Sequence, residues 1–439
     1  MSRAIIIFIA YLALTFTAQS AKQPNIVLII SDDQAWTDYS FMGHKSIETP
    51  NIDRLSKESR LFKRGYVPTS LCCPSLASII TGLYPHQTKI TGNEPPVPKA
   101  GKNSKQYFDQ VQECVSFIDN IPTLPRLLAK QGYASHQSGK WWQGHYSRGG
   151  FTHGMTHGDP KRGGRHGDKG LQIGRQGMKE IFNFIEQRDG KPFFTWYAPF
   201  LPHTPHNPPK RLLSKYTKKT DSKFIARYWA MCEWFDETCG ELLDYLDAKN
   251  LTKDTIVIYV TDNGWIQRAD NGRYAPRSKR SQYDGGIRTP IMVRWPGKIK
   301  PEERQELANS IDLAPTILKA CGINPTEDMH GINLLDDQEL TKRKSTYGAC
   351  YLHNAVDIHN PDANLTYRWL IHGDWKIILP NKINITTRSK EKGTDKVELY
   401  NLTTDPFEQK NLAESKQAIV KRLTRQLNKN LPTIQPEDI

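Results

Sequence analysis

The sequence predicts an α/β fold: a three-layer sandwich around a large, mainly parallel sheet, followed by a small C-terminal α+β subdomain. Three short apolar runs support this prediction, namely NIVLII (25–30), FFTWYA (193–198) and TIVIYV (255–260). None of them alternates with polar residues, and all are rich in β-branched or aromatic side chains, as is typical of strands buried on both faces of a parallel sheet. Helical stretches separate the runs, so strands and helices alternate along the chain.

The first residues, MSRAIIIFIAYLALTFTAQSAKQ, have the layout of a secretory signal peptide. Arg3 precedes an apolar stretch of moderate length, and small residues follow at 18–21. A membrane anchor is the alternative, but it needs a longer apolar span, and no later segment could cross a bilayer. We therefore expect a signal peptide at 1–20 and an exported mature protein, periplasmic or secreted, or lysosomal or extracellular if the source is eukaryotic.

Helices are expected at 50–62 (PNIDRLSKESRLF) and 224–250. Another should begin near Pro74, because proline suits a first helical turn and the apolar residues that follow recur at helical spacing. They are Leu76, Ile79, Ile80 and Leu83. The segments 99–116 and 158–175 have the composition of long loops, and the second contains the basic stretch DPKRGGRHGDKG. Loops of this kind often shape a substrate cleft.

The character of the chain changes after residue 340. TYRWLIHGDWKIILP and KVELYNLTTDPFEQKNLA predict short strands with turns, and SKQAIVKRLTRQLNKNL predicts a closing amphipathic helix. The expected domains are a catalytic domain at 21–340 and a C-terminal α+β subdomain at 341–439.

The composition fits a globular protein with a basic surface. Of the 439 residues, 37% are hydrophobic and 24% charged, which allows a sizeable core. The formal net charge of +14 favours an anionic partner, either nucleic acid, an anionic membrane or an anionic glycan. Since no long basic arm, zinc finger or RNP-type aromatic pattern is present, we expect no nucleic-acid partner. Seven cysteines are too few for a disulfide scaffold.

Acidic and amide side chains follow two of the predicted strands. Asp32 and Asp33 come after the first, and Asp262 and Asn263 after the third. In a parallel sheet the carboxyl ends of strands share one edge, where ligands bind. Four oxygen ligands there suit a hard divalent cation, Ca²⁺ or Mg²⁺. The alternative is that these residues form ordinary turns.

Cys72, in TSLCCPSLASIITGLYPH (69–86), would lie just outside the N-terminus of a helix. That environment stabilises anions and makes a cysteine side chain more reactive. A small buried hydrophobe is the other interpretation, and it holds for most free cysteines. The residues alone leave both open.

Three further side chains lie in polar stretches near predicted strand ends. They are Lys140 in SGKWWQG, His203 in LPHTPH and Lys279 in RSKRSQYDGG. Lysines can neutralise an oxyanion, and a histidine can donate a proton to a leaving group. His206 lies three residues after His203, and the residues alone do not decide which of the two histidines would donate the proton. Together with the cation ligands, these residues indicate a metal-dependent hydrolase acting on an oxyanion ester.

The order of the motifs resembles that of the formylglycine-dependent sulfatases, the type I branch of the alkaline-phosphatase-like superfamily. The similarity runs from NIVLIISDDQ through LCCPSLASIITGLYPH, GKWW, PHTPHNPP and TDNGW to YDGGIRTPIMVRWPG. It continues into GDWKIILP and ELYNLTTDPFEQKNLA, and so covers nearly all of the mature protein. The ordered set is far more specific than any single motif.

The resemblance implies a sulfuric ester hydrolase of the calcium-binding, secreted or periplasmic kind, acting on a sulfated polysaccharide or other sulfated carbohydrate. A formylglycine-generating or sulfatase-maturing enzyme would oxidise Cys72 to formylglycine (3-oxoalanine), whose hydrated aldehyde attacks sulfur. One Ca²⁺ per chain would be held by Asp32, Asp33, the modified Cys72, Asp262 and Asn263. Lys140, His203 and Lys279 match positions that bind the sulfate or assist the leaving group.

The chain departs from the family pattern twice. The signature C-x-P-S-R ends here in Leu76, giving C-C-P-S-L, and the histidine of G-K-W-H is Trp142. An indole cannot accept a proton, so His145 or a residue of 158–175 is a candidate to replace that base. The chain is therefore either an active variant, which the surviving metal ligands and the presence of Lys140, His203 and Lys279 favour, or a catalytically weak or inactive binder of sulfated glycans. A phosphoesterase of the same superfamily is a separate alternative.

Overall fold

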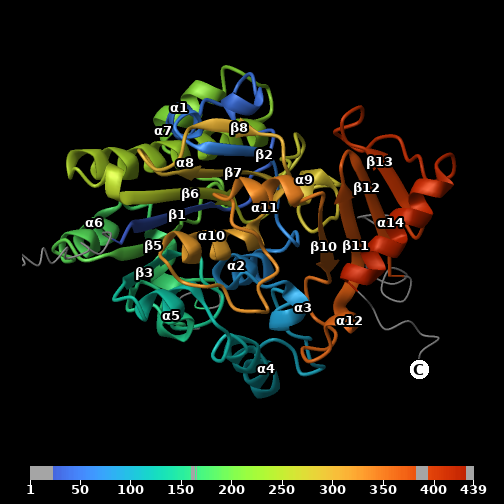
Figure 1. Ribbon diagram of the computed structural model, residues 1–439, viewed down its shortest axis with the longest axis horizontal. Coiled ribbons are helices and arrows are strands. Elements are labelled where there is room, and N and C mark those ends of the chain that lie inside the picture. Colours follow the sequence, from blue (N-terminus) through green and yellow to red (C-terminus); the bar gives the residue numbers. More distant parts are fainter. Residues whose placement is uncertain (1–22, 160–163, 165, 382–393, 432–439) are drawn as a thin grey trace, which may run out of the picture.

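A computed structural model of the chain describes residues 23–159, 164, 166–381 and 394–431 (Figure 1). Its central sheet has nine strands in the order β4-β3-β5-β1-β6-β7-β2-β8, with β9 also paired to β2. The strands are β1 (Asn25–Ser31), β2 (Arg60–Tyr66), β3 (Ala134–Gly139), β4 (His153–Gly154), β5 (Phe193–Ala198), β6 (Thr255–Thr261), β7 (Arg288–Arg294), β8 (Glu302–Arg304) and β9 (Ala308–Asn309). Only β7 runs antiparallel to its neighbours, β6 and β2. The expected signal peptide at 1–20 lies outside the described residues.

Helices cover both faces of this sheet, as the alternation along β1 illustrates. Ile26, Leu28 and Ile30 pack into one apolar cluster, whereas Val27 and Ile29 pack into the other. The first cluster includes side chains of α2 (Cys72–Thr81), α5 (Leu124–Ala129) and α10 (Leu313–Ala320). The second includes side chains of α1 (Pro50–Lys57), α6 (Lys179–Glu186) and α8 (Lys223–Ala248). The predicted three-layer α/β sandwich is therefore confirmed.

A second sheet follows the first, with the antiparallel order β10-β11-β12-β13. Its strands are β10 (Ser345–Tyr351), β11 (Leu365–His372), β12 (Trp375–Pro380) and β13 (Glu398–Asn401). Helix α14 (Gln417–Asn430) buries Leu423 and Leu427 against this sheet, as its amphipathic pattern predicts (Figure 1, right). The expected C-terminal α+β subdomain is present.

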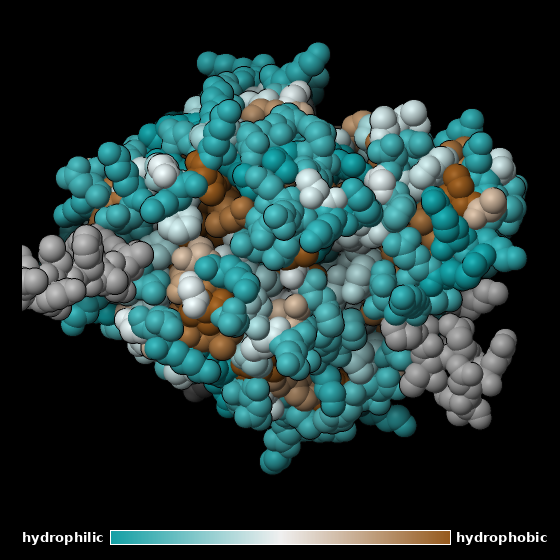
Figure 2. Space-filling model, in the orientation of Figure 1, coloured by the Kyte–Doolittle hydropathy of each residue, from teal (hydrophilic) through white to brown (hydrophobic). Residues whose placement is uncertain are grey.

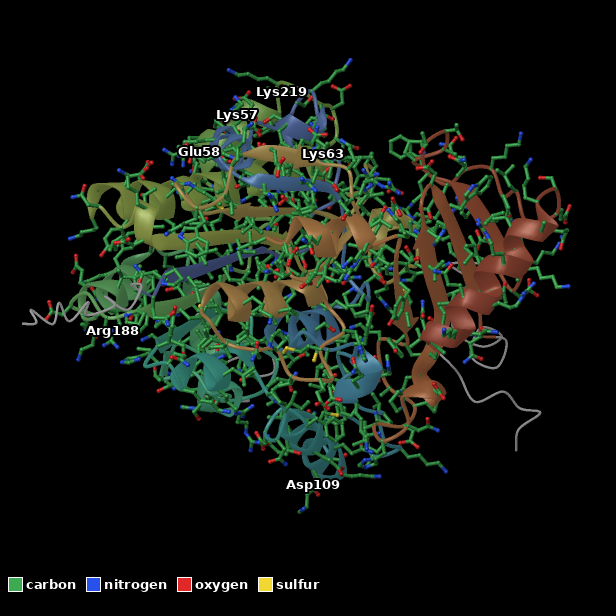
Figure 3. All side chains as sticks on the ribbon, viewed as in Figure 1. Lys57, Glu58, Lys63, Asp109, Arg188 and Lys219 are labelled. Atoms are coloured by element: carbon green, nitrogen blue, oxygen red, sulfur yellow. The ribbon has the colours of Figure 1, made fainter. Side chains whose placement is uncertain are left out.

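The remaining helices are α3 (Pro85–Thr88), α4 (Lys105–Ser116), α7 (Lys210–Tyr216), α9 (Asp284–Ile287), α11 (Asp337–Lys342) and α12 (Pro361–Asn364). Charged side chains such as Asp109, Arg188 and Lys219 lie at the periphery (Figure 3). The visible face of the molecule is covered mostly by hydrophilic residues (Figure 2). None of the helices within the described ranges has the length and apolar character needed to span a membrane.

Three local expectations were wrong. The helix expected at 50–62 ends at Lys57, and β2 begins at Arg60, because Leu61 and Phe62 pair with β7. Both side chains fit a helical stripe as well as a strand, so the apolar spacing could not place the boundary. Part of the loop expected at 99–116 is α4, whose N-cap Ser104 accepts a hydrogen bond from the Tyr107 amide.

The third concerns α2. Cys72 is its first residue rather than a flanking one, since Leu71, in extended conformation, is the N-cap. All ten residues of α2 are buried, so the helix lies inside the molecule and has no solvent face. This position allows its N-terminus to face the edge of the central sheet.

Candidate active site

The site lies where β1, β3, β5 and β6 end. Strands β1 and β6 are parallel neighbours, and their register pairs Ser31 with Thr261. The residues that follow, Asp32 and Asp262, therefore start side by side at the same sheet edge. The Asp33 backbone is left-handed (φ 65°), and its amide donates to Asp262 Oδ1 at 3.0 Å. A left-handed aspartate is strained, so the surrounding contacts must hold it in place.

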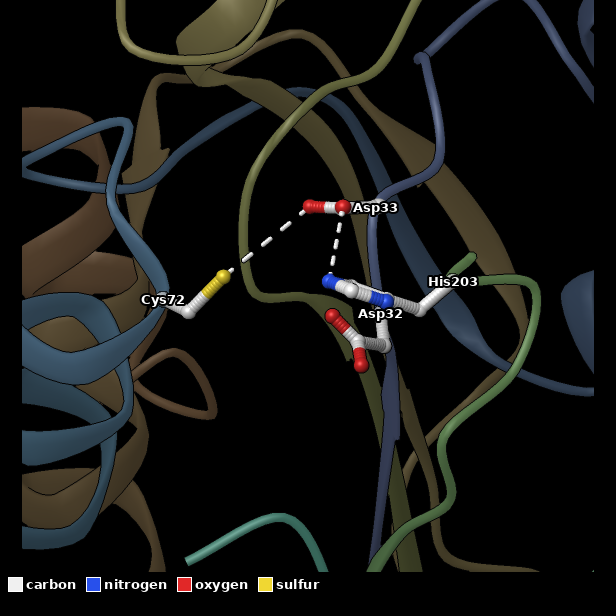
Figure 4. A group of neighbouring side chains, drawn as sticks. All are labelled: Asp32, Asp33, Cys72 and His203. Carbon is white, nitrogen blue, oxygen red and sulfur yellow. Dashed lines mark hydrogen bonds and ion pairs between the residues drawn. The ribbon is translucent and has the colours of Figure 1, made fainter. Parts of the chain in front are cut away.

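Cys72 faces this edge from the N-terminus of α2 (Figure 4). Its Sγ lies 3.2 Å from Lys140 Nζ, 3.2 Å from Lys279 Nζ and 4.0 Å from Asp33 Oδ1. Burial raises the pKa of the thiol to about 12, against the opposing effect of the two lysines. An unmodified Cys72 is therefore a protonated thiol at neutral pH and a poor nucleophile.

Lys140 follows β3 directly and reaches the site because β3 and β5 end close together. The preceding Gly139 is left-handed (φ 83°), and a Cβ there would lie 1.8 Å from the Ala198 carbonyl oxygen. Only glycine fits this close approach. The buried Lys140 ammonium donates to Asp32 Oδ1 at 2.7 Å, and burial does not discharge it because Asp32 and Cys72 raise its pKa well above the usual value.

Lys279 approaches Cys72 through a loop between β6 and α9. Its Nζ lies 2.6 Å from each carboxylate oxygen of Asp33. Although burial lowers the pKa of Lys279, Asp33 and Cys72 raise it above its usual value, so the ammonium is retained. The ammonium groups of two lysines that are far apart in the chain thus lie next to the same sulfur atom.

His203 follows β5 in the segment LPHTPH, and its ring stacks on Phe200. Its Nδ1 is 2.6 Å from the Thr204 carbonyl oxygen, which fixes the proton of the neutral ring on Nδ1. Nε2, at 3.3 Å from Asp33 Oδ2, is therefore the atom that gains or loses a proton. Burial and Lys140 lower the pKa of His203 well below its usual value, against the opposing effect of Asp33. His206 packs instead against Tyr228 and Trp265.

The pKa values of the three carboxyl groups, Asp32, Asp33 and Asp262, are those expected of a site that binds a cation. Burial raises the pKa of Asp32 well above its usual value and also raises that of Asp262. Burial acts on Asp33 in the same sense, yet Lys279 and His203 bring its pKa down to about 2. Three buried carboxylates face two ammonium groups, so the cluster lacks positive charge.

Three buried oxygen atoms of this cluster are left over after every hydrogen bond is assigned. Asp32 Oδ2, Asp262 Oδ2 and Asn263 Oδ1 have no hydrogen-bond partner in the part of the chain that the structure describes. Leaving a buried polar atom unsatisfied costs about 1–3 kcal/mol. Oxygen atoms of this kind are ligands for a hard divalent cation, so the residues present fit the predicted metal. Ligand atoms of Asp32, Asp33, Cys72 and His203 also lie within 4.8 Å of one another.

All eight residues singled out from the sequence therefore lie together at one buried site. The arrangement of a cation site, two ammonium groups and an imidazole around the α2 N-terminus suits a tetrahedral oxyanion that accumulates charge during reaction. Sequence reasoning missed Asn93, whose Oδ1 accepts from the Cys73 amide at 3.0 Å. Nothing in the local pattern ITGNEPP distinguishes it from a turn residue.

The two departures from the signature occupy buried positions. Leu76 is part of the apolar cluster beneath α2. Trp142 is also buried, and its ring meets that of His166 edge to face, with centroids 4.5 Å apart. His145 instead lies beside Tyr146 and His157. Of the candidates for the missing histidine, His166 from the basic stretch 158–175 is therefore the one in contact with Trp142.

Comparisons with known proteins agree on one family. The Sulfatase family profile matches residues 24–323, and the profile described as N-sulphoglucosamine sulphohydrolase, C-terminal, matches residues 272–436. The N-acetylgalactosamine-6-sulfatase of Canis lupus familiaris is 26% identical, over 89% of this chain and 82% of the relative. The N-acetylgalactosamine-6-O-sulfatase of Bacteroides thetaiotaomicron is 24% identical, over 93% of each.

The fold is also found in solved structures. A protein solved with its substrate D-glucosamine-2-N,6-O-disulfate superposes with a TM-score of 0.71 at 21% identity, covering 93% of this chain and 98% of that one. Because the Sulfatase profile spans more than half of the sequence, the chain belongs to the sulfatase family and is a sulfuric ester hydrolase.

Proposed function

We propose that this protein is an exported sulfatase that hydrolyses a sulfate ester of a sulfated carbohydrate, with Cys72 converted to formylglycine as the nucleophile. The observation that carries the proposal is the convergence of Lys140 Nζ and Lys279 Nζ on Cys72 Sγ, each at 3.2 Å. Two buried ammonium groups beside the Cys72 side chain stabilise a group that acquires negative charge at this position. The high pKa of the unmodified thiol argues that this group is not the thiolate.

Each group of site residues would have its own role in the hydrolysis of the ester. Asp32, Asp33, Asp262, Asn263 and the modified Cys72 would hold one Ca²⁺. When present, the cation polarises the sulfate and the formylglycine supplies the attacking hydroxyl. Lys140 and Lys279 bind the sulfate oxygens and stabilise the charge that develops on them. His203 Nε2, once protonated, donates its proton to the leaving oxygen.

A carbohydrate substrate is supported by three observations of different kinds. The formal net charge of +14 attracts an anionic polymer. Two relatives carry the name of an N-acetylgalactosamine-6-sulfatase or -6-O-sulfatase, and the solved relative holds a sulfated glucosamine. Export is supported by the layout of residues 1–20, and the catalytic unit is assigned to 21–340 with the C-terminal subdomain at 341–439.

The test combines the state of residue 72 with sulfate release. Protein made in its native exporting host, digested and analysed by mass spectrometry, should show the aldehyde in the peptide that contains Cys72, and it should release sulfate from at least one sulfated sugar or aryl sulfate. An unmodified thiol with no sulfate release from any ester would refute the proposal in favour of a glycan binder. Phosphate release exceeding sulfate release would point to the phosphoesterase.

Removal of divalent cations should lower both activity and thermal stability. A ligand present at about 100 times its dissociation constant stabilises a protein by about 2.7 kcal/mol, so chelation followed by calorimetry should show a clear fall in Tm. Ca²⁺ should restore it more fully than Mg²⁺, because a site that offers several carboxylate and amide oxygen ligands suits the larger ion. Asp262→Asn is the matched variant and should respond less to Ca²⁺. An unchanged Tm and unchanged activity after chelation would contradict the metal site.

A further inference from the structure

A cavity of about 380 Å³ lies between Arg280, the segment 96–97 and the segment 352–356. Arg280, His353 and Asn354 supply its polar side. Val97 and Val356, which are 47% and 52% exposed, form part of its apolar rim. A mixed lining of this kind, with a few convergent polar groups, is typical of a ligand subsite.

Both walls of the cavity are attached to the backbone around Cys72. Arg280 directly follows Lys279, and its amide donates to the Ser70 carbonyl oxygen at 3.0 Å. On the other side, the Asn93 amide donates to the His353 carbonyl oxygen at 2.9 Å, and Asn93 Oδ1 accepts from the Cys73 amide. The two walls of the cavity are therefore bonded to the residues on either side of Cys72, and Arg280 follows Lys279 in the chain.

Arg280 gives the cavity its positive charge. Across residues 23–159, 164, 166–381 and 394–431, no acidic side chain forms an ion pair with Arg280, and its buried Nε has no hydrogen-bond partner. Its backbone is left-handed (φ 66°), a conformation that costs a non-glycine residue free energy. Arg277, three residues earlier, is in contrast bonded to the Glu408 carbonyl oxygen and packed over Tyr283.

The neighbouring polar groups are neutral. Burial lowers the pKa of His353 to about 4, so its imidazole is uncharged at neutral pH. His353 Nδ1 lies 2.8 Å from Asn354 Oδ1 and His353 Nε2 lies 3.5 Å from Asn93 Nδ2, which leaves the amide nitrogen of Asn354 to donate to a sugar hydroxyl. The guanidinium is thus the one charged group among the cavity's lining residues, and a guanidinium recognises carboxylate or sulfate through two parallel hydrogen bonds.

We propose that this cavity is a subsite for a second anionic group of the substrate, a carboxylate or a further sulfate next to the ester that is hydrolysed, and that Arg280 is the residue that selects it. The proposal rests on the proposed function and specifies its substrate: a sugar that carries at least two negative charges. Arg280 contacts the substrate away from the reacting atoms, so it contributes to binding and not to the chemical step.

The test measures inhibition of 4-nitrophenyl sulfate hydrolysis by three sugars: N-acetylgalactosamine 6-sulfate, the same sugar linked to a uronic acid, and N-acetylgalactosamine 4,6-disulfate. In the wild type, at least one doubly charged sugar should inhibit roughly tenfold to a hundredfold more strongly than the singly charged one. Arg280→Gln should abolish that advantage and leave kcat for 4-nitrophenyl sulfate unchanged. The uronate and the disulfate distinguish a carboxylate from a sulfate as the second group.

Arg273→Gln provides the matched control, because Arg273 is an exposed arginine in the same region of the chain. It should retain the preference, and Arg280→Lys should recover part of it. An equal inhibition by all three sugars in the wild type, or a preference that survives in Arg280→Gln, would overturn the subsite while leaving the sulfatase intact. Absence of sulfate release from 4-nitrophenyl sulfate and from every sulfated sugar tested, by aldehyde-bearing protein, would instead overturn the proposed function.

Discussion

Replacing Cys72 by alanine is expected to abolish sulfate release, with a fall in kcat of roughly 10⁴-fold or more, the scale seen when a nucleophile is removed from a catalytic unit. The substitution removes the atom on which Lys140 and Lys279 converge and the residue that we propose is converted to the aldehyde. The carboxylates and both ammonium groups stay in place. Release of inorganic sulfate from an aryl sulfate measures the effect, and circular dichroism verifies that the variant folds.

Cys73→Ala is the control that the chain itself offers. Cys73 is equally buried and also belongs to the first turn of α2, but its Sγ accepts from Gln143 Nε2 at 3.4 Å and not from the lysines. Its kcat should stay within about tenfold of the wild type, since a small change at a buried position mainly affects stability. If Cys72→Ala retains activity comparable to that of Cys73→Ala, the nucleophile has been assigned to the wrong residue.

The central strands could be predicted because they are apolar on both faces, as β1, β5 and β6 are. Strand β3 could not, because its sequence ASHQSG has no apolar run. It is nevertheless buried, since its polar side chains find partners inside: Ser138 Oγ donates to the Trp196 carbonyl oxygen and Gln137 Nε2 to that of Gly139. Hydrogen bonds of this kind depend on tertiary neighbours, and no local pattern encodes them.

The candidate site likewise has some residues that could be predicted from the sequence and others that could not. Asp32 and Asp262 could be brought together from the sequence, because parallel strands place their carboxyl ends at one edge. The approach of Lys279 required the family resemblance, since a lysine in a loop is ordinarily a solvated charge. Asn93, Arg280 and His353 were not found by either route. They meet through loops far apart in the chain, and each lies in a stretch whose composition is that of an ordinary turn.

Replacing Lys376 by methionine should destabilise the protein by about 3–5 kcal/mol, the usual cost of removing one partner from a buried ion pair. Lys376 lies on β12 and is fully buried, with its Nζ 2.9 Å from Asp284 Oδ1 and 2.7 Å from Glu408 Oε1. Methionine fills the volume but removes the ammonium from two buried carboxylates, and Asp284 keeps only the longer ion pair with Arg288, whose Nη1 lies 3.6 Å from Asp284 Oδ2. Denaturant unfolding measures the loss. Lys63→Met, which removes an exposed pair with Glu303, should cost at most about 1 kcal/mol.

The same variant should show a steeper fall in stability as pH rises. Burial already raises the pKa of Glu408 to about 7 against the opposing effect of Lys376, and loss of that ammonium raises it further. The raised folded-state pKa means that stability is retained at low pH and lost as pH rises through it. The deficit relative to wild type should therefore be larger above pH 7 than below it. A deficit that does not change with pH would contradict an uncompensated carboxylate.

The Lys376 cluster also bears on catalysis, because Asp284 lies five residues after Lys279 and its amide donates to Glu408 Oε2 at 2.6 Å. Residues 277–284 are thus fixed to the C-terminal subdomain on one side and present Lys279 to Cys72 on the other. If this attachment positions Lys279, Lys376→Met should lower kcat more than it raises KM, even well below its unfolding transition. A destabilised variant with an unchanged kcat would show that the cluster joins the two sheets without placing the lysine.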